Sequence, residues 1–307
     1  MNKIIFFLIA TCFAVLSCTK EKTDYEAEIE VEVPEYNEFK EAVAIHSEGY
    51  DIKIEALNGT FYKGYNEIRL TISDSQTSNE ANVTNVTLLP IMTKADGNKH
   101  SCPHRYNLAY RTDGKYFSGY SVFTSESLVD GVWELHIRFT INHKTYTTKQ
   151  RITVQQQTNK NLNMTTFTGR DDEQYVIALV SPQRPKVGEN ELIAGIYKFN
   201  KSAASAKDYP DPSQFSYTEA SGYTLQLDPR MPEPSMGNHS SPNNEDLVQR
   251  DDGLYRGVVN YTMTGNWTLN FIMLNQNGKI LKGTNVPTDF TPGIEGVKSE
   301  LYLDILF

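Results

Sequence analysis

Apolar and polar residues alternate with a period of two through most of this 307-residue chain, and this pattern limits the fold more than any other feature. Clear examples run over residues 51–56, 66–72, 132–141 and 145–154. Such alternation is typical of strands that bury one face on a core. Turn-forming pairs such as Asn58-Gly59 separate the segments, and no long stretch has a helical period. The sequence therefore predicts an all-β protein.

The second half of the chain repeats the first. At a spacing of 139 residues, eleven identities fall within 29 positions, which chance would rarely supply. The matched pairs are Leu88 and Leu227, Pro90 and Pro229, Met92 and Met231, His100 and His239, Ser101 and Ser240, Pro103 and Pro242, Leu108 and Leu247, Arg111 and Arg250, Asp113 and Asp252, Gly114 and Gly253, and Tyr116 and Tyr255. Spacings of 124 and 134 continue the match on either side, at residues 64–68 and 131–135. Each change of spacing falls in an expected loop, where insertions are tolerated, so the pattern predicts a tandem duplication.

The chain begins like an exported protein. Lys3 precedes an almost entirely apolar run over residues 4–16, which is too short for a membrane-spanning helix and typical of a secretory signal. The run ends in Leu16-Ser17-Cys18, which resembles the bacterial lipobox. The resemblance implies cleavage before Cys18, its acylation, and a lipid anchor in the bacterial cell envelope, with the outer membrane favoured and the protein facing the periplasm or the surface. The alternative is an ordinary cleaved signal in which Cys18 has no role.

Each copy has the length and strand spacing of an immunoglobulin-like sandwich. One tryptophan per copy, Trp133 and Trp267, lies on an alternating segment, where core packing is the expected role. The predicted fold is all-β, with two tandem immunoglobulin-like β-sandwich domains. The expected parts are a signal peptide over 1–17, the lipidated cysteine and an acidic tether over 18–45, a first sandwich over 46–155, a linker over 156–170 and a second sandwich over 171–307.

Charge and cysteine content narrow the range of partners. The formal net charge is −9, and loss of Lys3 with the signal makes it −10. There is no basic block, so the sequence carries no electrostatic footprint for nucleic acid. Of the three cysteines, Cys12 leaves with the signal and Cys18 is expected to be acylated. Cys102 then has no intrachain disulfide partner, and it is a buried thiol, an oxidised thiol or a soft metal ligand.

The candidate chemistry lies in two corresponding segments that follow residues 90 and 229. Both combine Pro, Gly, Ser and Asn with methionine, which is usual in cores rather than in loops. The donors in the second segment are Met231, Met236 and His239, and those in the first are Met92, His100, Cys102 and His104. Soft sulfur donors favour Cu(I), whereas a zinc site needs more Cys and His ligands than the second segment has. We therefore expect a metal site, with copper favoured over zinc.

The second copy resembles the YtkA-like and FixH-like domain family. The similarity is carried by the run Met-Pro-Glu-Pro-Ser-Met-Gly-Asn-His at residues 231–239 and by the later Gly-x-Trp at 265–267. It covers residues 188–275 well and extends to 64–140 more weakly, through the repeat. The resemblance implies small extracytoplasmic β-sandwiches, which in some members are linked to copper handling or cytochrome oxidase assembly.

Departures from the family pattern leave simpler roles open. Glu233, Pro234 and Ser235 lengthen the usual compact Met-Pro-x-Met segment, and the first copy has His-Ser-Cys-Pro-His after its methionine, so its ligand set would differ. A methionine at a strand edge often plugs the end of a sandwich, and a nearby histidine is often only solvated. Met263 has a counterpart in the family, but its alternating strand context predicts a core position.

Two functions follow from the sequence. The first is a membrane-anchored lipoprotein that binds a soft metal through its Met/His loops, for capture, delivery or tolerance, and exchanges it with a transfer protein. The second is a non-metal surface or periplasmic module that presents loops to a protein or glycan. The sequence has no nucleophile elbow, P-loop or dinucleotide fingerprint, so we expect no enzyme.

Overall fold

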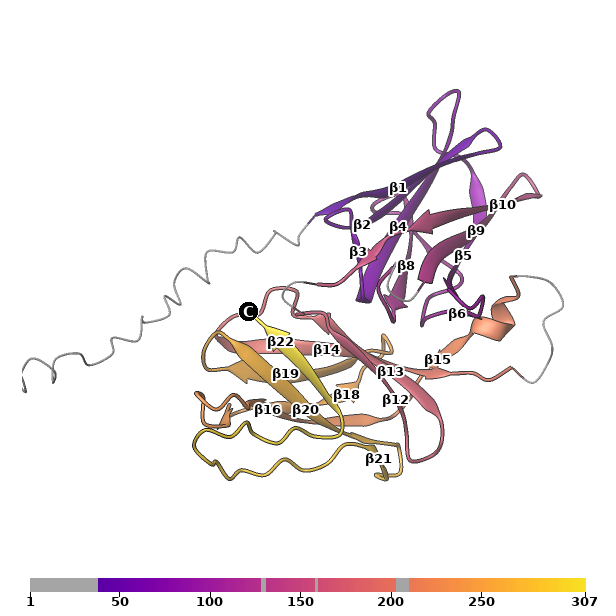
Figure 1. The fold of residues 1–307 in the computed structure, drawn as a ribbon. Helices are drawn as coiled ribbons and strands as arrows, with labels where there is room; N and C mark the ends of the chain where they lie inside the picture. The colour runs from indigo at the N-terminus through magenta and orange to yellow at the C-terminus, as the bar shows by residue number, and fades with distance from the viewer. Residues whose placement is uncertain (1–37, 128–130, 158–159, 203–209) are drawn as a thin grey trace, which may run out of the picture. The chain divides into compact units, whose positions relative to one another are not determined.

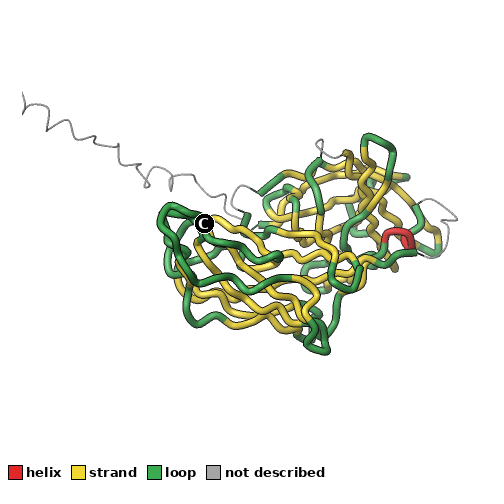
Figure 2. Tube along the Cα trace, turned by 60° about the horizontal axis from the view of Figure 1, so that its bottom comes forward, coloured by secondary structure: helices red, strands yellow, loops and turns green. Residues whose placement is uncertain are grey.

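The computed structural model describes residues 38–127, 131–157, 160–202 and 210–307 (Figure 1). These residues are strands and loops, and the one helical element among them is the short 3₁₀ turn η2 (Pro212–Phe215), drawn red in Figure 2. No helix in the described part is long and apolar enough to cross a bilayer. The signal run and Cys18 lie outside the described residues. The all-β prediction is confirmed.

The first sandwich consists of two antiparallel sheets around one core. One sheet has the strand order β1 (Phe39–Ser47), β2 (Tyr50–Leu57), β4 (Gly64–Asp74), β8 (Tyr116–Phe123) and β7 (Ala109–Arg111). The other has the order β10 (Lys144–Ile152), β9 (Gly131–Ile141), β5 (Val83–Lys94) and β6 (Lys99–His100). Two short strands, β3 (Phe61–Tyr62) and β11 (Val154–Gln155), pair in parallel. Every second residue of β4 and β9 is buried, as the alternation predicts.

The second sandwich has a core of its own and one continuous antiparallel sheet. The order is β12 (Met164–Thr168), β13 (Gln174–Ser181), β14 (Gly188–Phe199), β19 (Tyr255–Tyr261), β18 (Glu245–Gln249), β16 (Thr224–Met231), β20 (Asn266–Leu274) and β21 (Ile280–Lys282). Three more strands pair beside this path: β15 (Tyr217–Glu219), β17 (His239–Ser240) and β22 (Tyr302–Leu306). Strand β18 pairs with β19 on one edge and β16 on the other, and so joins the two halves of the sheet.

Matched positions of the two copies hold matched contacts. Asn66 on β4 and Asn190 on β14 each donate from Nδ2 to the carbonyl oxygen of the glycine two residues earlier, at 2.9 and 2.8 Å. Each also donates to the carbonyl oxygen four residues earlier, at 2.6 and 2.7 Å. These bonds close the same turn at the start of each strand, so the repeat in the sequence has a structural counterpart.

Two expected boundaries differ from the observed strands. Strand β1 begins at Phe39, inside the segment 18–45 that the sequence predicts to be a tether, because these residues pair with β2 along its whole length. Strand β12 lies inside the expected linker 156–170. Its threonines conceal the alternation, but Met164 is buried and Phe167 stacks on a tyrosine of β13, so it packs as a strand.

The two sandwiches pack together through a third, smaller apolar cluster. Its buried members come from β8, β12, β13 and β14 and are Val122, Met164, Val176, Ala178 and Tyr197. Beside it, Tyr217 Oη donates to the Ser101 carbonyl oxygen at 3.2 Å, and Tyr120 Oη donates to the Glu219 carboxylate at 2.9 Å. The described residues from Glu38 to Phe307 belong to one compact unit.

Candidate metal centre

In each sandwich the methionine and the histidine of the repeat face each other across two paired strands. Met92 of β5 is opposite His100 of β6, and Met231 of β16 is opposite His239 of β17. Each histidine ring also lies against the tryptophan of its own copy, with ring centroids 5.9 Å apart in the first and 6.1 Å apart in the second. We call these places the first Met/His end (Met92, His100, Cys102, His104 and Trp133) and the second Met/His end (Met231, Met236, His239, Met263 and Trp267).

A glycine two residues before each tryptophan makes room for the methionine. Gly131 has a φ of +155°, and an added Cβ would lie 2.9 Å from Met92 Sδ and would collide with a backbone carbonyl of β5. Gly265 has a φ of +131°, and an added Cβ would lie 2.9 Å from Met231 Cε. Glycine tolerates both this backbone conformation and the close contact. The repeated Gly-x-Trp motif is thus explained by packing between the thioether and a bare backbone.

The two repeat methionines lie in the cores and not in exposed loops. Met92 is 0% exposed and Met231 is 1% exposed, and each belongs to the core of its own sandwich. Both residues are paired strand residues, Met92 within β5 and Met231 at the end of β16, and both side chains turn inward. The expectation that both thioethers lie in exposed loops was wrong for these two residues. A metal ion at either end would have to approach from the side of the histidine.

Of the next two donors of the first Met/His end, Cys102 is buried and His104 is half-buried. Cys102 is fully enclosed in the first core, and burial raises the pKa of its thiol well above its usual range. His104 donates from Nδ1 to the Cys102 carbonyl oxygen at 2.7 Å, and burial lowers the pKa of its imidazole. A metal binds cysteine as the thiolate, so this environment disfavours Cys102 as a ligand. The matched positions of the second copy hold Ser241 and Asn243.

At the second Met/His end, Met236 lies in the turn that joins β16 to β17. The turn is closed by a hydrogen bond from Met236 N–H to the Glu233 carbonyl oxygen at 2.9 Å, and by one from His239 N–H to the Met236 carbonyl oxygen at 3.2 Å. The Met236 side chain is half-buried against the second core. His239 Nε2 lies 2.8 Å from Thr262 Oγ1. The turn therefore places one thioether and one imidazole near the surface.

Met263 is a further sulfur donor at the same end, although its alternating sequence context predicts a core position. It lies in the turn between β19 and β20, next to the Thr262 hydroxyl that meets His239, and it is 37% exposed. Its carbonyl oxygen accepts a hydrogen bond from Trp267 Nε1 at 3.0 Å. The corresponding tryptophan of the first copy donates to the carbonyl oxygen of Ser125, also at 3.0 Å. The carbonyl that accepts the tryptophan hydrogen bond thus belongs to a methionine in the second copy and to a serine in the first.

A segment without strands, residues 283–301, runs between β21 and β22 and holds the turn of Met236; we call it the strap. Gly296 N–H donates to the Pro232 carbonyl oxygen at 2.7 Å. Asn238 Nδ2 donates to the Pro287 carbonyl oxygen at 3.1 Å. These bonds tie both sides of the turn to the strap, so the second Met/His end is braced from outside its own hairpin.

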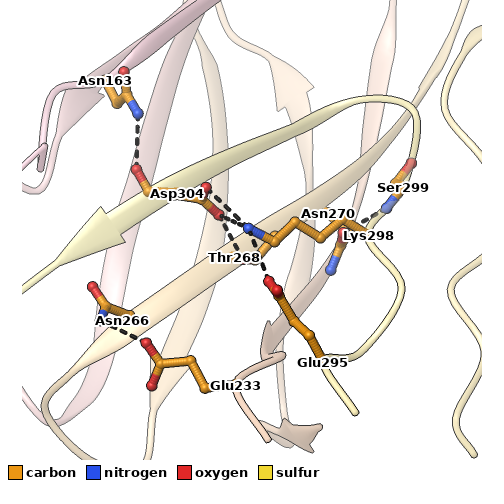
Figure 3. Close-up of polar contacts among 9 residues, drawn as sticks. All are labelled: Asn163, Glu233, Asn266, Thr268, Asn270, Glu295, Lys298, Ser299 and Asp304. Carbon is orange, nitrogen blue, oxygen red and sulfur yellow. Dashed lines mark hydrogen bonds and ion pairs between the residues drawn. The ribbon is translucent and has the colours of Figure 1, made fainter.

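The strap and the turn are themselves anchored on the sheet (Figure 3). Lys298 Nζ lies 3.1 Å from Asp304 Oδ2 on β22 and 3.7 Å from Glu295. Ser299 N–H donates to an asparagine oxygen on β20 at 2.8 Å. From the turn, Glu233 accepts a hydrogen bond from Asn266 at 2.7 Å. These polar contacts limit the movement of the turn that carries Met236.

The donor set of the second end is three thioethers and one imidazole. Within the described ranges, no group of three or more His, Cys, Asp and Glu side chains is placed to hold a metal ion. Methionine is not among those four residue types, and its thioether is a soft neutral ligand that suits Cu(I). Thioether and imidazole are donor types that suit a soft cation better than a hard one.

No protein-family model matches the chain, and no curated protein matches it significantly in sequence. The resemblance to the YtkA-like and FixH-like family therefore stays a prediction, and the residues of the two Met/His ends carry the functional inference.

Proposed function

We propose that this protein is a membrane-anchored extracytoplasmic lipoprotein that binds Cu(I) at its second Met/His end. The supporting observation is the pairing of Met231 with His239 across β16 and β17, against Trp267. Met236 lies in the turn that connects these strands, and Met263 follows Thr262, whose hydroxyl contacts His239. Sulfur and imidazole donors from three separate segments thus share one end of the sandwich.

The chemistry of these donors suits reversible copper binding. Thioethers carry no proton to lose, so they bind a metal ion without releasing one. The Thr262 hydroxyl can donate to His239 Nε2 in the metal-free protein, and that nitrogen exchanges this hydrogen bond for the metal. Zinc is less favoured, because the second end offers one imidazole and no thiolate.

The first Met/His end packs the sandwich in this account. Two of its donors, Met92 and Cys102, are in the core, and the thiol is held protonated by burial. His104 is committed to a backbone carbonyl through Nδ1. Its residues therefore supply matched controls for every measurement on the second end.

The lipid on Cys18 would hold the copper site at a membrane surface of the cell envelope, the outer membrane being favoured, from where the metal is passed to a transfer protein. Two acyl chains give stable anchoring without a spanning helix. Metabolic labelling with an alkyne fatty acid is expected to mark the wild-type protein and not Cys18→Ala. Equal labelling of the two, or release of both in soluble form, would contradict the anchor.

A Cu(I) titration tests the site itself. The chain from Thr19 onward contains every described residue, and it would be titrated anaerobically against a chromogenic Cu(I) chelator. We expect one equivalent to bind, with affinity at least about 100-fold weaker in Met236→Leu/His239→Gln, since each lost ligand removes a metal bond. The control His100→Gln/Cys102→Ser should bind as wild type does. Absence of binding in the wild type, or unchanged binding in both variants, would overturn the proposal.

A non-metal binding module is the second candidate. It is supported by a separate cleft of about 660 Å³ that is lined by residues of both sandwiches. The second Met/His end contributes no residue to that lining, so the two roles can be separated by experiment.

A further inference from the structure

The cleft between the sandwiches has the size of a small-molecule or oligosaccharide site, which is about 300–1,000 Å³. Its volume is about 660 Å³. The first sandwich contributes Lys94, Lys99, His100, Ser101, Thr124 and Ser125. The second contributes aromatic side chains from β12, β13, β14, β15 and η2, together with threonine and glutamine side chains. Both copies of the repeat are therefore needed to form it.

The two walls of the cleft are fixed to each other before any ligand binds. Tyr217, which lines the cleft, donates through Oη to the carbonyl oxygen of Ser101 on the opposite wall, at 3.2 Å. Val176, another lining residue, belongs to the buried apolar cluster at the junction of the sandwiches. A preformed site does not have to be ordered by its ligand, which favours binding.

Aromatic rings form one side of the cleft in two contacting pairs. Phe167 stacks on Tyr175 with centroids 5.6 Å apart, and Phe199 lies against Tyr217 with centroids 5.3 Å apart at an angle of 58°. Phe167, Phe199 and the nearby Phe215 are half-buried, so parts of their surfaces remain open to a ligand. The rings supply rigid, flat apolar surface at low conformational cost.

The polar side of the cleft is rich in hydroxyls, amides and positive charge. Thr124, Thr166, Thr168 and Gln174 can each donate and accept hydrogen bonds. Lys94 and Lys99 are exposed at the tip and the return of the β5–β6 hairpin. None of the described lining residues is acidic, although the chain carries a net charge of −9. The charged residues of the described lining are therefore both lysines, which can pair with an anionic ligand.

We propose that this cleft binds a carboxylate-bearing oligosaccharide. A pyranose ring presents an apolar C–H face that fits an aromatic surface and a rim of hydroxyls that both donate and accept, and its carboxylate pairs with lysine. An acidic peptide is the competing ligand. Strand β12 pairs with β13 on one side and forms the edge of the sheet on the other, and an extended peptide can pair with such an edge. The mixture of rings, hydroxyls and amides in the lining favours the saccharide.

Calorimetric titration of the lipid-free chain tests this proposal. The probes are tetragalacturonate, a hyaluronan tetrasaccharide and sialyllactose, with neutral cellotetraose and hexaglutamate as comparisons. We expect at least one acidic saccharide to bind, and to bind better than cellotetraose and hexaglutamate. Binding should weaken at least about tenfold in Lys94→Gln/Lys99→Gln, equivalent to about 1.4 kcal/mol, and should fall with added salt.

Matched variants separate the cleft from general charge and folding effects. Lys115→Gln/Lys279→Gln removes one exposed lysine from each sandwich outside the cleft and should leave binding unchanged. Phe199→Ala/Phe215→Ala should abolish binding. If this variant does not fold, the comparison of Lys94→Gln/Lys99→Gln with the wild type still tests the proposal. Binding by no acidic saccharide, equal binding by both lysine variants, or binding of hexaglutamate alone would overturn the proposal. Copper binding at the second Met/His end should be unchanged in the lysine variants, so either proposal can fail alone.

Discussion

The two Met/His ends share an inner set of residues and differ in everything around it. Both have a buried methionine paired with a histidine across two strands, a tryptophan against the histidine, and a glycine against the methionine. The first end adds a buried thiol and a half-buried imidazole. The second adds two sulfur donors nearer to solvent and an external strap. The shared residues therefore pack both ends, and the residues added at the second end are what would let its methionine and histidine bind copper as well.

The largest expected effects come from the two buried methionines. Met92→Ala and Met231→Ala should each lower the free energy of unfolding by about 2–5 kcal/mol, because each leaves a cavity in a core. Met92→Leu and Met231→Leu conserve volume and should cost less than about 1.5 kcal/mol. Only Met231→Leu should weaken Cu(I) binding. Urea-induced unfolding and the Cu(I) titration measure these effects, and equal loss of copper in both leucine variants would remove the distinction between the ends.

The glycines should separate the two ends on stability. Gly131→Ala would force a Cβ into a backbone carbonyl that cannot move aside, with a cost of about 3 kcal/mol. Gly265→Ala meets only the flexible end of Met231, so the expected cost is about 1–2 kcal/mol. Thermal unfolding of the two variants compares them directly. The reverse order of melting temperatures would show that the second end is the more tightly packed.

Acid should destabilise the first end selectively, through His104. Burial lowers the pKa of this imidazole below its ordinary value of 6.5, so the folded protein favours the neutral form. The neutral His104 imidazole therefore makes its full contribution to the free energy of unfolding above about pH 6.5. This contribution is lost as the pH falls below that value toward the pKa in the folded protein. Asn243 occupies the matched position and does not titrate.

Replacement of His104 by the residue of the second copy tests this assignment. His104→Asn should reduce the loss of unfolding free energy between pH 7 and pH 5, as measured by urea unfolding at each pH. His143→Asn, at an exposed turn with a positive φ that asparagine tolerates, is the control and should leave the pH dependence unchanged. An identical acid response in wild type and His104→Asn would exclude this histidine as the source.

The smallest expected effect concerns the strap, which belongs to the second end alone. Lys298→Met removes the ion pairs to Asp304 and Glu295, and partly exposed pairs of this kind contribute about 0.5–1 kcal/mol. The variant should also exchange the amide of Gly296 faster, since its bond to Pro232 depends on the position of the strap. Hydrogen exchange measures this, and unchanged protection would mean that the strap is held by its backbone contacts.

The sequence predicted the strands better than the site. Alternation over β4 and β9 identified the buried faces, because a period of two directly reflects strand geometry. The repeat located both Met/His ends. The sequence could not place Met92 and Met231 in the core, since Pro, Gly and Asn nearby indicate a loop while pairing with β6 and β17 extends the strands to these residues.

The other features of the site depend on contacts between segments far apart in the chain. Met263 follows an alternating strand, and only the turn observed between β19 and β20 exposes it. The strap has no period, so its bonds to the turn of Met236 have no signal in the sequence. The cleft needs both sandwiches in contact, which a pattern within either copy cannot reveal.

X-ray absorption spectroscopy of the stoichiometric Cu(I) complex would identify the atoms bound to copper. We predict thioether sulfur together with a single imidazole around copper, with the imidazole signal lost in His239→Gln and retained in His100→Gln. A copper environment without sulfur, or one that changes with His100 and not with His239, would contradict the assignment of the metal to the second Met/His end.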